Sequence, residues 1–320
     1  MRASIQTLLD QYQVRKTVKQ KQAFIAFMRT HAYEHGYKLD EQHYKNGRGK
    51  NLFVGKPERA KVFVTAHYDT PANALIPIAT VVGSAPVYLI SQALVFLPVI
   101  ILFWVLQLAI TAVVGDMGLL AAPMFFFGLN ISLFVFLMLI VWCFQMMMGV
   151  ANKKNANDNT SGVSVLLAML EDLSREEREK VCFVFFDEEE KGLEGAKAFK
   201  RFYYEETRFK PLINFDCVAH GKHLMFITKK EFRESPFHAL LAEATSEKAL
   251  MKEGFRYVYA SDQLIFKNSV GVASLHKMPV VGYYLSRLHS RFDTKFSVAN
   301  IEALSGMMIE FISKIEKNEN

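Results

Sequence analysis

The 320 residues suffice for one large domain or two modest ones. The net charge is +6, and many of the lysine and arginine residues alternate with glutamate along the chain. This mixed pattern argues against a basic stripe interleaved with aromatic residues, so we expect no nucleic-acid partner. Three cysteines without a C-x-x-C pair argue against a disulfide framework and favour a reducing compartment.

The first part of the chain, residues 1–75, has the pattern of a globular domain. Helical apolar periodicity covers residues 4–36 and lacks the continuous apolar core of a signal peptide. Short strand patterns follow in "GYKL" and "NLFVG". The stretch "KVFVTAH", residues 61–67, is a β-branched and aromatic strand that ends at a polar loop.

A long apolar segment follows, in which Asp116 is the only formally charged residue between Ala74 and Val150. Its stretches 87–114 and 119–150 each exceed the roughly 20 residues that span a bilayer, and "GDMG" between them predicts a turn. We therefore expect residues 76–150 to form an inserted transmembrane α-helical hairpin. Four shorter spans or a buried hairpin are the alternatives, but apolar residues on all faces disfavour the buried one.

Charges around this segment predict its orientation. Arg59, Lys61, Lys153 and Lys154 flank it on the side of the globular domain, whereas the turn has no lysine or arginine. By the positive-inside rule, the protein is expected to be an integral protein of the cell membrane, with its globular domain facing the cytoplasm and the lipid bilayer as a partner. Three prolines within residues 71–86 predict a loop or short interfacial element there.

Beyond residue 150, helix and strand patterns alternate. The helix patterns cover residues 159–176, 192–206, 235–250 and 297–317, and the strand patterns cover 180–190, 211–221, 223–229 and 280–294. This alternation predicts an α/β fold with a mostly parallel, mixed sheet between helices, completed by residues 151–320.

Acids and histidines follow the predicted strands, where ligands bind in α/β sheets. The ends of four strands and the start of one helix carry them: His67 and Asp69, Glu188 to Glu190, Asp216, His289, and Asp158 before the helix. Histidine and carboxylate without clustered thiols suit zinc or a similar ion. A two-metal hydrolase needs one bridging carboxylate, two further ligands for each metal and a base, which this set supplies.

Five ordered motifs carry a resemblance to a known family. The motifs "AHYDT", "NANDNTSGV", "FFDEEEKGLEGAKAF", "INFDCV" and "LHSRFDT" resemble those of the M28 family of co-catalytic zinc aminopeptidases. The resemblance covers roughly residues 20–75 and 150–318 and implies the family's three-layer zinc-peptidase fold. The offset of 91 residues from His67 to Asp158 is longer than in relatives, because the apolar segment lies between them.

The resemblance implies a role for each matching residue. It implies two zinc ions, with His67 and Asp216 on one, Glu190 and His289 on the other, and Asp158 bridging both. Glu189 matches the general acid/base, Asp69 matches the carboxylate that orients the first histidine, and the bond from Asp158 to Asn159 is expected to be cis. Glu188 leaves a second register open, with base and ligand at Glu188 and Glu189.

The implied function is a membrane-anchored di-zinc aminopeptidase that removes N-terminal residues from short peptides, so the expected partner is a peptide with a free N-terminus. A glutaminyl-cyclase-like aminoacyltransferase and a non-catalytic scaffold of the same fold are the alternatives. His220 is either near the site or an ordinary loop histidine. Aromatic residues of the segment 235–276 either wall the specificity pocket or pack in the core. The sequence predicts no oligomeric state.

Overall fold

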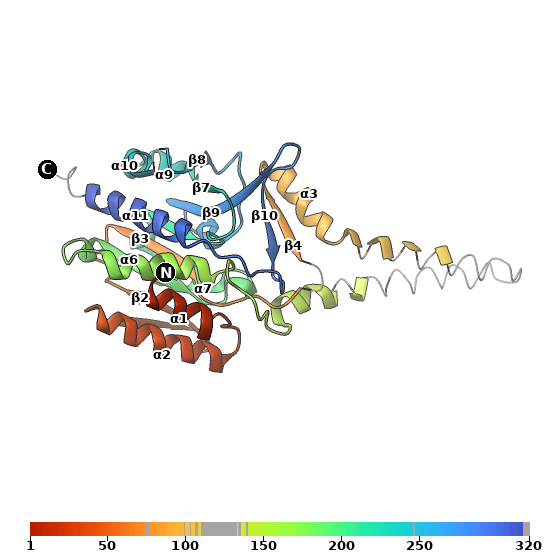
Figure 1. Ribbon diagram of the computed structural model, residues 1–320, viewed down its shortest axis with the longest axis horizontal. Helices are drawn as coiled ribbons and strands as arrows, with labels where there is room; N and C mark the ends of the chain where they lie inside the picture. The colour runs from red at the N-terminus through yellow and green to blue at the C-terminus, as the bar shows by residue number, and fades with distance from the viewer. Residues whose placement is uncertain are drawn as a thin grey trace, which may run out of the picture.

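Among the described residues, ten strands form one sheet in the computed structural model of the protein (Figure 1). The structure describes residues 1–74, 77–98, 100–102, 104–105, 108–109, 133, 136–138, 140–245 and 247–315. The strands are β1 (Leu39–Tyr44), β2 (Gly49–Val54), β3 (Val62–His67), β4 (Ile78–Val82), β5 (Val181–Phe186), β6 (Leu212–Phe215), β7 (His223–Thr228), β8 (Leu250–Glu253), β9 (Ser269–Met278) and β10 (Gly282–Leu288). Their order is β1-β2-β5-β3-β6-β9-β10-β4, and β7 pairs with β9 and β8.

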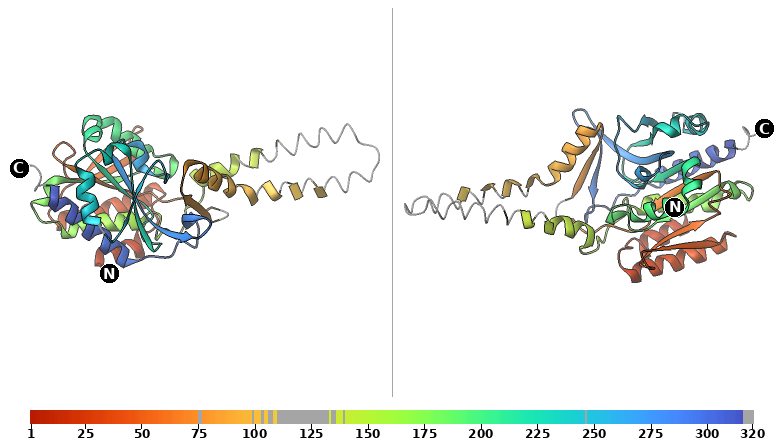
Figure 2. Two further views of the ribbon diagram at one scale, coloured as in Figure 1. Left: turned by 90° about the horizontal axis from the view of Figure 1, so that it is seen from above. Right: turned by 180° about the vertical axis from the view of Figure 1, so that it is seen from behind.

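Helices cover both faces of this sheet (Figures 1 and 2). The helices are α1 (Ala3–Gln11), α2 (Val18–Glu34), α3 (Ala85–Val95), α6 (Thr160–Asp172), α7 (Glu194–Phe202), α8 (Tyr204–Phe209), α9 (Lys230–Arg233), α10 (Phe237–Thr245) and α11 (Val298–Ile315). Three short 3-10 helices are η1 (Glu177–Lys180), η2 (Glu189–Lys191) and η3 (Asp262–Ile265). One face packs on α1, α2, α6, α10 and α11, and the other on α7 and η3.

The central strands are buried on both faces because their residues alternate between two hydrophobic clusters. Val64 and Phe183 join the cluster under α6 and α11, while Phe63 and Cys182 join the cluster under α7. Successive side chains of a strand point to opposite faces, so a continuous apolar run suits a sheet covered on both sides. Cys182 is thus a core residue.

The expected mixed sheet between helices is confirmed, but the expectation that it is mostly parallel is wrong. Among the described residues, four strand pairs are parallel and five are antiparallel, and parallel pairing dominates only at the centre. Strands β5, β3, β6 and β9 pair in parallel, whereas β1, β2, β10 and β4 add antiparallel edges. The predicted helix over 159–176 is α6, and the closing helix over 297–317 is α11. The segment 71–86 was expected to form a loop or short interfacial element, but it contains β4, which extends the sheet beside β10.

The prediction of a transmembrane hairpin over 76–150 is wrong, and with it the prediction of a cell-membrane protein whose globular domain faces the cytoplasm. Among the described residues, no helix is both long and apolar enough to cross a membrane. Helix α3 has 11 residues and therefore rises only about 16 Å, against the roughly 30 Å of a hydrocarbon core. Parts of the spans predicted over 87–114 and 119–150, and the turn at Asp116, lie outside the described residues.

The two ends of the inserted segment lie side by side. Ala72 bridges to Ala151, and the Asn73 amide donates to the Val150 carbonyl at 2.8 Å. The two ends of the segment between His67 and Asp158 are therefore held together at one point. Helix α3 packs on β4 next to β10, at the same end of the sheet in Figures 1 and 2.

Gly162 in the first turn of α6 lies against the end of β6, which gives a test of this packing. A Cβ at this position would lie 2.2 Å from the carbonyl oxygen of Phe215. We expect Gly162→Ala to lower the free energy of unfolding by about 1–3 kcal/mol, because backbone atoms must move apart. Urea unfolding followed by circular dichroism measures this change.

Gly306 in α11 is the matched control, because a Cβ there meets no atom of the described structure within 4 Å. Gly306→Ala should leave the free energy of unfolding unchanged or raise it by up to about 1 kcal/mol, since alanine favours helix. Equal effects of the two substitutions would contradict the close approach of α6 to β6.

Candidate metal centre

Three adjacent parallel strands bring four of the sequence-predicted residues to one edge of the sheet. Strand β3 lies between β5 and β6, so the carboxyl ends of all three meet. His67 is the last residue of β3, Asp216 follows β6, and Glu189 and Glu190 form η2 shortly after β5. His67 is 1% exposed and therefore lies at the floor of the site.

His289 reaches the same place by a different route. Strand β9 pairs with β6 only from Ser269 to Val272 and then continues past the end of β6 to Met278. Strand β10 returns antiparallel to this extension and ends at Leu288, directly before His289. The long β9–β10 hairpin therefore supplies a ligand to a site built mainly from parallel strands.

Asp158 lies between the two histidines and faces each with a different oxygen. Its Oδ1 lies 3.6 Å from His67 Nε2, and its Oδ2 lies 3.2 Å from His289 Nε2. On the first side, Asp216 Oδ1 is 3.5 Å from His67 Nε2; on the second, Glu190 Oε2 is 3.4 Å from His289 Nε2. The five predicted ligands thus fall into two halves that share Asp158.

Asp158 lies in the loop before α6 and is held in place by Asp293, in the loop after β10. Its amide and that of Asn157 each donate to the Asp293 carboxylate at 2.9 Å. Asn159 caps α6 by accepting from the Gly162 amide, and its side-chain amide donates to the Phe215 carbonyl. The peptide bond from Asp158 to Asn159 is cis, as the resemblance implied.

Asp69 touches more than the histidine for which the sequence proposed it. The backbone carbonyl of Asp69 is 3.1 Å from His67 Nδ1, whereas the carboxylate Oδ1 lies 3.6 Å from that nitrogen. The carboxylate accepts from the amides of Glu189 and Glu190, at 3.0 and 3.3 Å. Asp69 therefore links the His67 ring to the backbone of η2 and positions both glutamates.

The three consecutive glutamates after β5 separate into two environments. Glu190 faces His289, and Glu189 offers a carboxylate oxygen within 4.8 Å of ligand atoms of His67 and Asp216. Glu188 instead forms ion pairs with Lys45 and Lys191, at 3.2 and 2.8 Å. The structure therefore places Glu189 and Glu190 at the site, in the register that the sequence favoured.

The electrostatics of the centre call for a cation. Burial and the Asp158 charge raise the pKa of Glu190 well above its usual range, and burial and the Glu190 charge do the same for Glu189. Burial lowers the pKa of His67, but the nearby carboxylates, Glu189 first, raise it well above normal. Like charges crowded in a buried site repel one another, and a divalent ion removes this repulsion.

The residues present fit zinc. Imidazole nitrogens and carboxylate oxygens are its common ligands, and two triplets of potential ligand atoms, His67–Asp158–Glu190 and His67–Glu189–Asp216, each lie within 4.8 Å. Glu190 Oε1, Asp216 Oδ1 and His289 Nδ1 are buried atoms without a hydrogen-bond partner. Buried polar atoms in proteins are nearly always partnered, so the two carboxylate oxygens are available to an ion.

A cavity of about 210 Å³ opens onto these ligands. Asp158, Glu189, Glu190, Asp216 and His289 lie on its polar side. Its other walls come from β4, α3, β10 and the end of the inserted segment, through Ile78, Thr80, Tyr88, Gln92, Met146, Leu285 and Leu288. The inserted segment therefore forms part of the site, which its apolar composition did not reveal.

Sequence reasoning left several buried residues of this region unassigned. Arg15 is fully buried, donates to the Tyr68 carbonyl at 2.5 Å and contacts the Thr160 hydroxyl at 3.2 Å, so it ties the loop after β3 to α6. Asp293 was visible within "LHSRFDT", but only the fold shows that it holds Asp158. Burial raises the pKa of the Cys217 thiol well above its usual range.

The structure bears on two further sequence hypotheses, which concern His220 and the aromatic residues of 235–276. His220 Nε2 lies 3.2 Å from His276 Nε2 and is not among the residues that line the cavity. Of the aromatic residues in 235–276, Tyr259 lines the cavity and donates to the Asp216 carbonyl. Phe266 packs in the core, and Phe255 is exposed.

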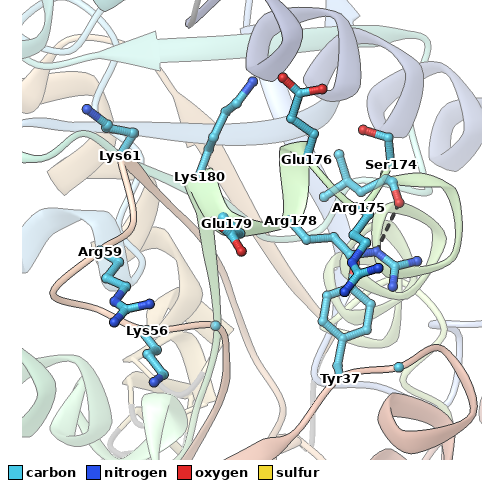
Figure 3. A pocket seen from close by; sticks show the side chains of 13 residues that line it. Tyr37, Lys56, Arg59, Lys61, Ser174, Arg175, Glu176, Arg178, Glu179 and Lys180 are labelled. Carbon is cyan, nitrogen blue, oxygen red and sulfur yellow. Dashed lines mark hydrogen bonds between the residues drawn. The ribbon is translucent and has the colours of Figure 1, made fainter.

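A larger cavity, of about 930 Å³, lies at the opposite end of the central strands (Figure 3). Lys61 and Lys180, which precede β3 and β5, line it together with Arg59, Arg175 and Arg178. Figure 3 shows these side chains spread along the cavity wall, with Arg178 against Tyr37. As far as the structure describes its lining, no sequence-predicted ligand belongs to it.

Comparisons with solved structures agree with this fold. A Zn-dependent exopeptidase from Parabacteroides distasonis matches with a TM-score of 0.57 and 13% identity, over 97% of this chain and 95% of that one. A glutaminyl cyclase from Porphyromonas gingivalis matches with 0.57 and 14%, over 98% and 96%. A leucine aminopeptidase precursor from Bacteroides thetaiotaomicron matches with 0.54 and 12%, over 97% and 94%. At these identities the likeness concerns the fold alone.

A search of curated proteins finds no match. A family model, in contrast to the fold comparisons, identifies the family of the chain. The model of peptidase family M28 matches residues 147–307, half of the chain. The matched range includes Asp158, Glu189, Glu190, Asp216 and His289. The resemblance seen in the motifs is confirmed, together with the expectation of a zinc metallopeptidase, and the protein belongs to peptidase family M28.

Proposed function

We propose that the protein is an aminopeptidase that holds two zinc ions and removes N-terminal residues from short peptides. The observation that carries this proposal is the position of Asp158, whose two oxygens face the two histidines of separate ligand pairs. His67 and Asp216 would hold one ion, and Glu190 and His289 the other, with Asp158 shared. A bridging carboxylate between two such pairs is the arrangement of two-metal hydrolases.

Glu189 is the proposed general acid/base. It lines the cavity beside Asp216 and His67, and its backbone amide is held by Asp69. Bound zinc supplies Lewis-acid polarisation of the substrate carbonyl and makes water a nucleophile at neutral pH. Glu189 takes the proton of the attacking water and delivers it to the amine that leaves when the peptide bond breaks.

The shape of the cavity supports cleavage at a chain end. Its volume of about 210 Å³ is below the roughly 300–1,000 Å³ of most ligand pockets, so it suits one residue rather than a continuous strand. The cationic α-amine of a free N-terminus would lie near the carboxylates. Ile78, Leu285 and Leu288 on the facing wall favour an apolar side chain.

A second candidate is an aminoacyltransferase that cyclises N-terminal glutamine and releases ammonia. The observation in its favour is that a glutaminyl cyclase matches this fold as well as an exopeptidase does. Two complete ligand pairs around Asp158 favour the peptidase. A third possibility is a non-catalytic scaffold. The site argues against it, because all predicted ligands and the proposed base are present.

One experiment separates these functions. Purified full-length protein with added zinc is incubated with a peptide library in free and N-acetylated forms, including peptides that begin with glutamine, and products are identified by mass spectrometry. The peptidase should shorten free peptides from the N-terminus and leave acetylated peptides intact. Loss of ammonia from glutamine peptides without shortening would establish the second candidate. If no product formed from any peptide, the result would support the third.

Removal of metal should abolish hydrolysis and destabilise the protein. Without a cation the carboxylates of Asp158, Glu190 and Asp216 repel one another at close range. Free zinc at 100 times its dissociation constant should stabilise the fold by about 2.7 kcal/mol for each site. Calorimetry and turnover of chelated protein, before and after zinc is restored, measure both effects. Full activity in protein shown to be metal-free would contradict the proposal.

A further inference from the structure

A second group of potential metal ligands lies away from the candidate metal centre. His31 and His35 belong to the end of α2, and Glu171 lies near the end of α6. Their ligand atoms all fall within 4.8 Å of one another. The other end of α2 faces the metal centre, where Lys21 pairs with Asp187. Ten residues of helix separate Lys21 from His31, a rise of about 15 Å.

The spacing of the two histidines places both rings on one side of α2. Residues four apart in a helix are neighbours on its surface, and the ring centroids of His31 and His35 are 4.4 Å apart. His35 Nδ1 lies 2.9 Å from the His31 carbonyl oxygen and donates its proton there. This hydrogen bond leaves the lone pair of His35 on Nε2, the form in which a histidine binds metal.

His31 has a buried nitrogen that lacks a hydrogen-bond partner. The residue is 5% exposed, and its Nε2 makes no hydrogen bond in the structure. The nearest oxygen, Glu171 Oε1, is 3.5 Å from this nitrogen, too far for a hydrogen bond. A buried unpartnered nitrogen that faces a carboxylate oxygen calls for a third group between them.

The carboxylate of Glu171 is held at both oxygens, including Oε1, which faces His31. Arg2 Nη1 lies 3.1 Å from Oε2, and the Ser4 hydroxyl contacts Oε1. Arg2 also pairs with Asp172 and Glu302, so its charge is shared among three acids. These three acids outnumber Arg2, while Arg178 donates to the His35 carbonyl at 2.6 Å.

These side chains also line an open space. A cavity of about 500 Å³ lies over them, with Thr7, Phe27 and Thr30 among its other residues. An ion held by three protein ligands keeps further coordination positions for water, and this cavity provides room for them.

We propose that His31, His35 and Glu171 bind one divalent transition-metal ion, zinc in the first place, and that this ion links α2 to α6. Two imidazole nitrogens and one carboxylate oxygen are ligands that zinc prefers. Tetrahedral ligands about 2.1 Å from zinc lie about 3.4 Å from one another. The observed 3.5 Å between His31 Nε2 and Glu171 Oε1 matches that separation. The site is additional to the two ions of the proposed active centre.

Counting ions tests the site. Full-length protein is stripped of metal, dialysed against buffered free zinc and analysed by inductively coupled plasma mass spectrometry. His35→Ala and Glu171→Gln should each bind one ion per chain fewer than the wild type. His35 is half-buried, so its replacement should leave the fold intact, whereas His31 is too deeply buried to serve as the main variant.

His43→Ala is the matched control, because His43 also lies beside a glutamate, at 3.2 Å, but belongs to no such triplet in the described residues. It should bind as many ions as the wild type. Peptide hydrolysis should be unchanged in His35→Ala, and the zinc-induced rise in melting temperature should be smaller than in the wild type.

The result does not depend on the active centre. If that centre held one ion or none, the total would fall in all proteins, but the difference between wild type and His35→Ala would remain one. Equal zinc content and equal zinc-induced stabilisation in wild type, His35→Ala and Glu171→Gln would overturn the proposal, and a water molecule would then occupy the space beside His31.

Discussion

Glu189→Gln is expected to lower kcat for peptide hydrolysis by about 10²–10⁴-fold while the zinc content stays the same. Glutamine has nearly the same shape as glutamate but cannot accept a proton from the attacking water. The amide of residue 189 still donates to Asp69, so η2 keeps its position. Turnover of a free peptide and metal analysis of the same sample measure the two quantities.

Glu188→Gln is the control for this substitution. The two residues are neighbours in the chain, but the Glu188 carboxylate pairs with Lys45 and Lys191 and does not line the cavity. Its replacement removes partly exposed ion pairs and should change kcat less than about twofold, with a stability loss of up to about 1 kcal/mol. If Glu188→Gln were the inactive variant instead, the base and ligand would shift to Glu188 and Glu189.

The central half of the sheet could be predicted from the sequence because its strands are apolar on both faces. Runs such as Val181–Phe186 contain only apolar residues, and a polar residue follows where the strand leaves the core. The same feature placed His67 and Asp216 correctly at strand ends. Local pattern and tertiary position agree there, since a strand that is buried on both faces must be apolar at nearly every residue.

Strand β9 and the route of His289 could not be predicted in this way. The pattern in 269–278 ends in His276, Lys277 and Met278, where β9 runs past β6 and β7 and pairs with β10. In the sequence analysis, only the order of the family motifs paired His289 with Glu190 and Asp158. No local sequence pattern indicated that pairing. Likewise Arg15 and Asp293 support the site through contacts with Tyr68 and Asn157, which lie far from them in the chain.

The inserted segment shows the limit of hydropathy as a guide. An apolar run of sufficient length predicts a span, but composition does not report where helices begin and end or what they contact. In the structure, β4 pairs with β10, and Tyr88 and Gln92 of α3 face the metal ligands. The prolines that suggested a loop over 71–86 flank β4 and α3: Pro77 precedes the strand, and Pro86 lies in the first turn of the helix, which tolerates it.

Asp158→Asn should be the more damaging substitution, with loss of both zinc ions and a fall in kcat/KM of more than about 10³-fold. The amide offers one oxygen where the carboxylate offers two, so it cannot face His67 and His289 alike. Zinc contributes several kcal/mol of transition-state stabilisation, and each 1.4 kcal/mol is about a factor of ten in rate. Metal content and kcat/KM measured over a range of free zinc check this expectation.

Asp172→Asn is the control, because Asp172 ends the helix that follows Asp158 and pairs with Arg2 at the surface. It should keep the zinc content of the active centre and the activity. High free zinc should restore the zinc content and kcat/KM of Asp158→Asn only in part, since both ligand pairs then lack the negative charge of Asp158. An Asp158→Asn protein that retained two active-site ions would show that His67–Asp216 and Glu190–His289 bind independently, and Asp158 would lose its bridging role.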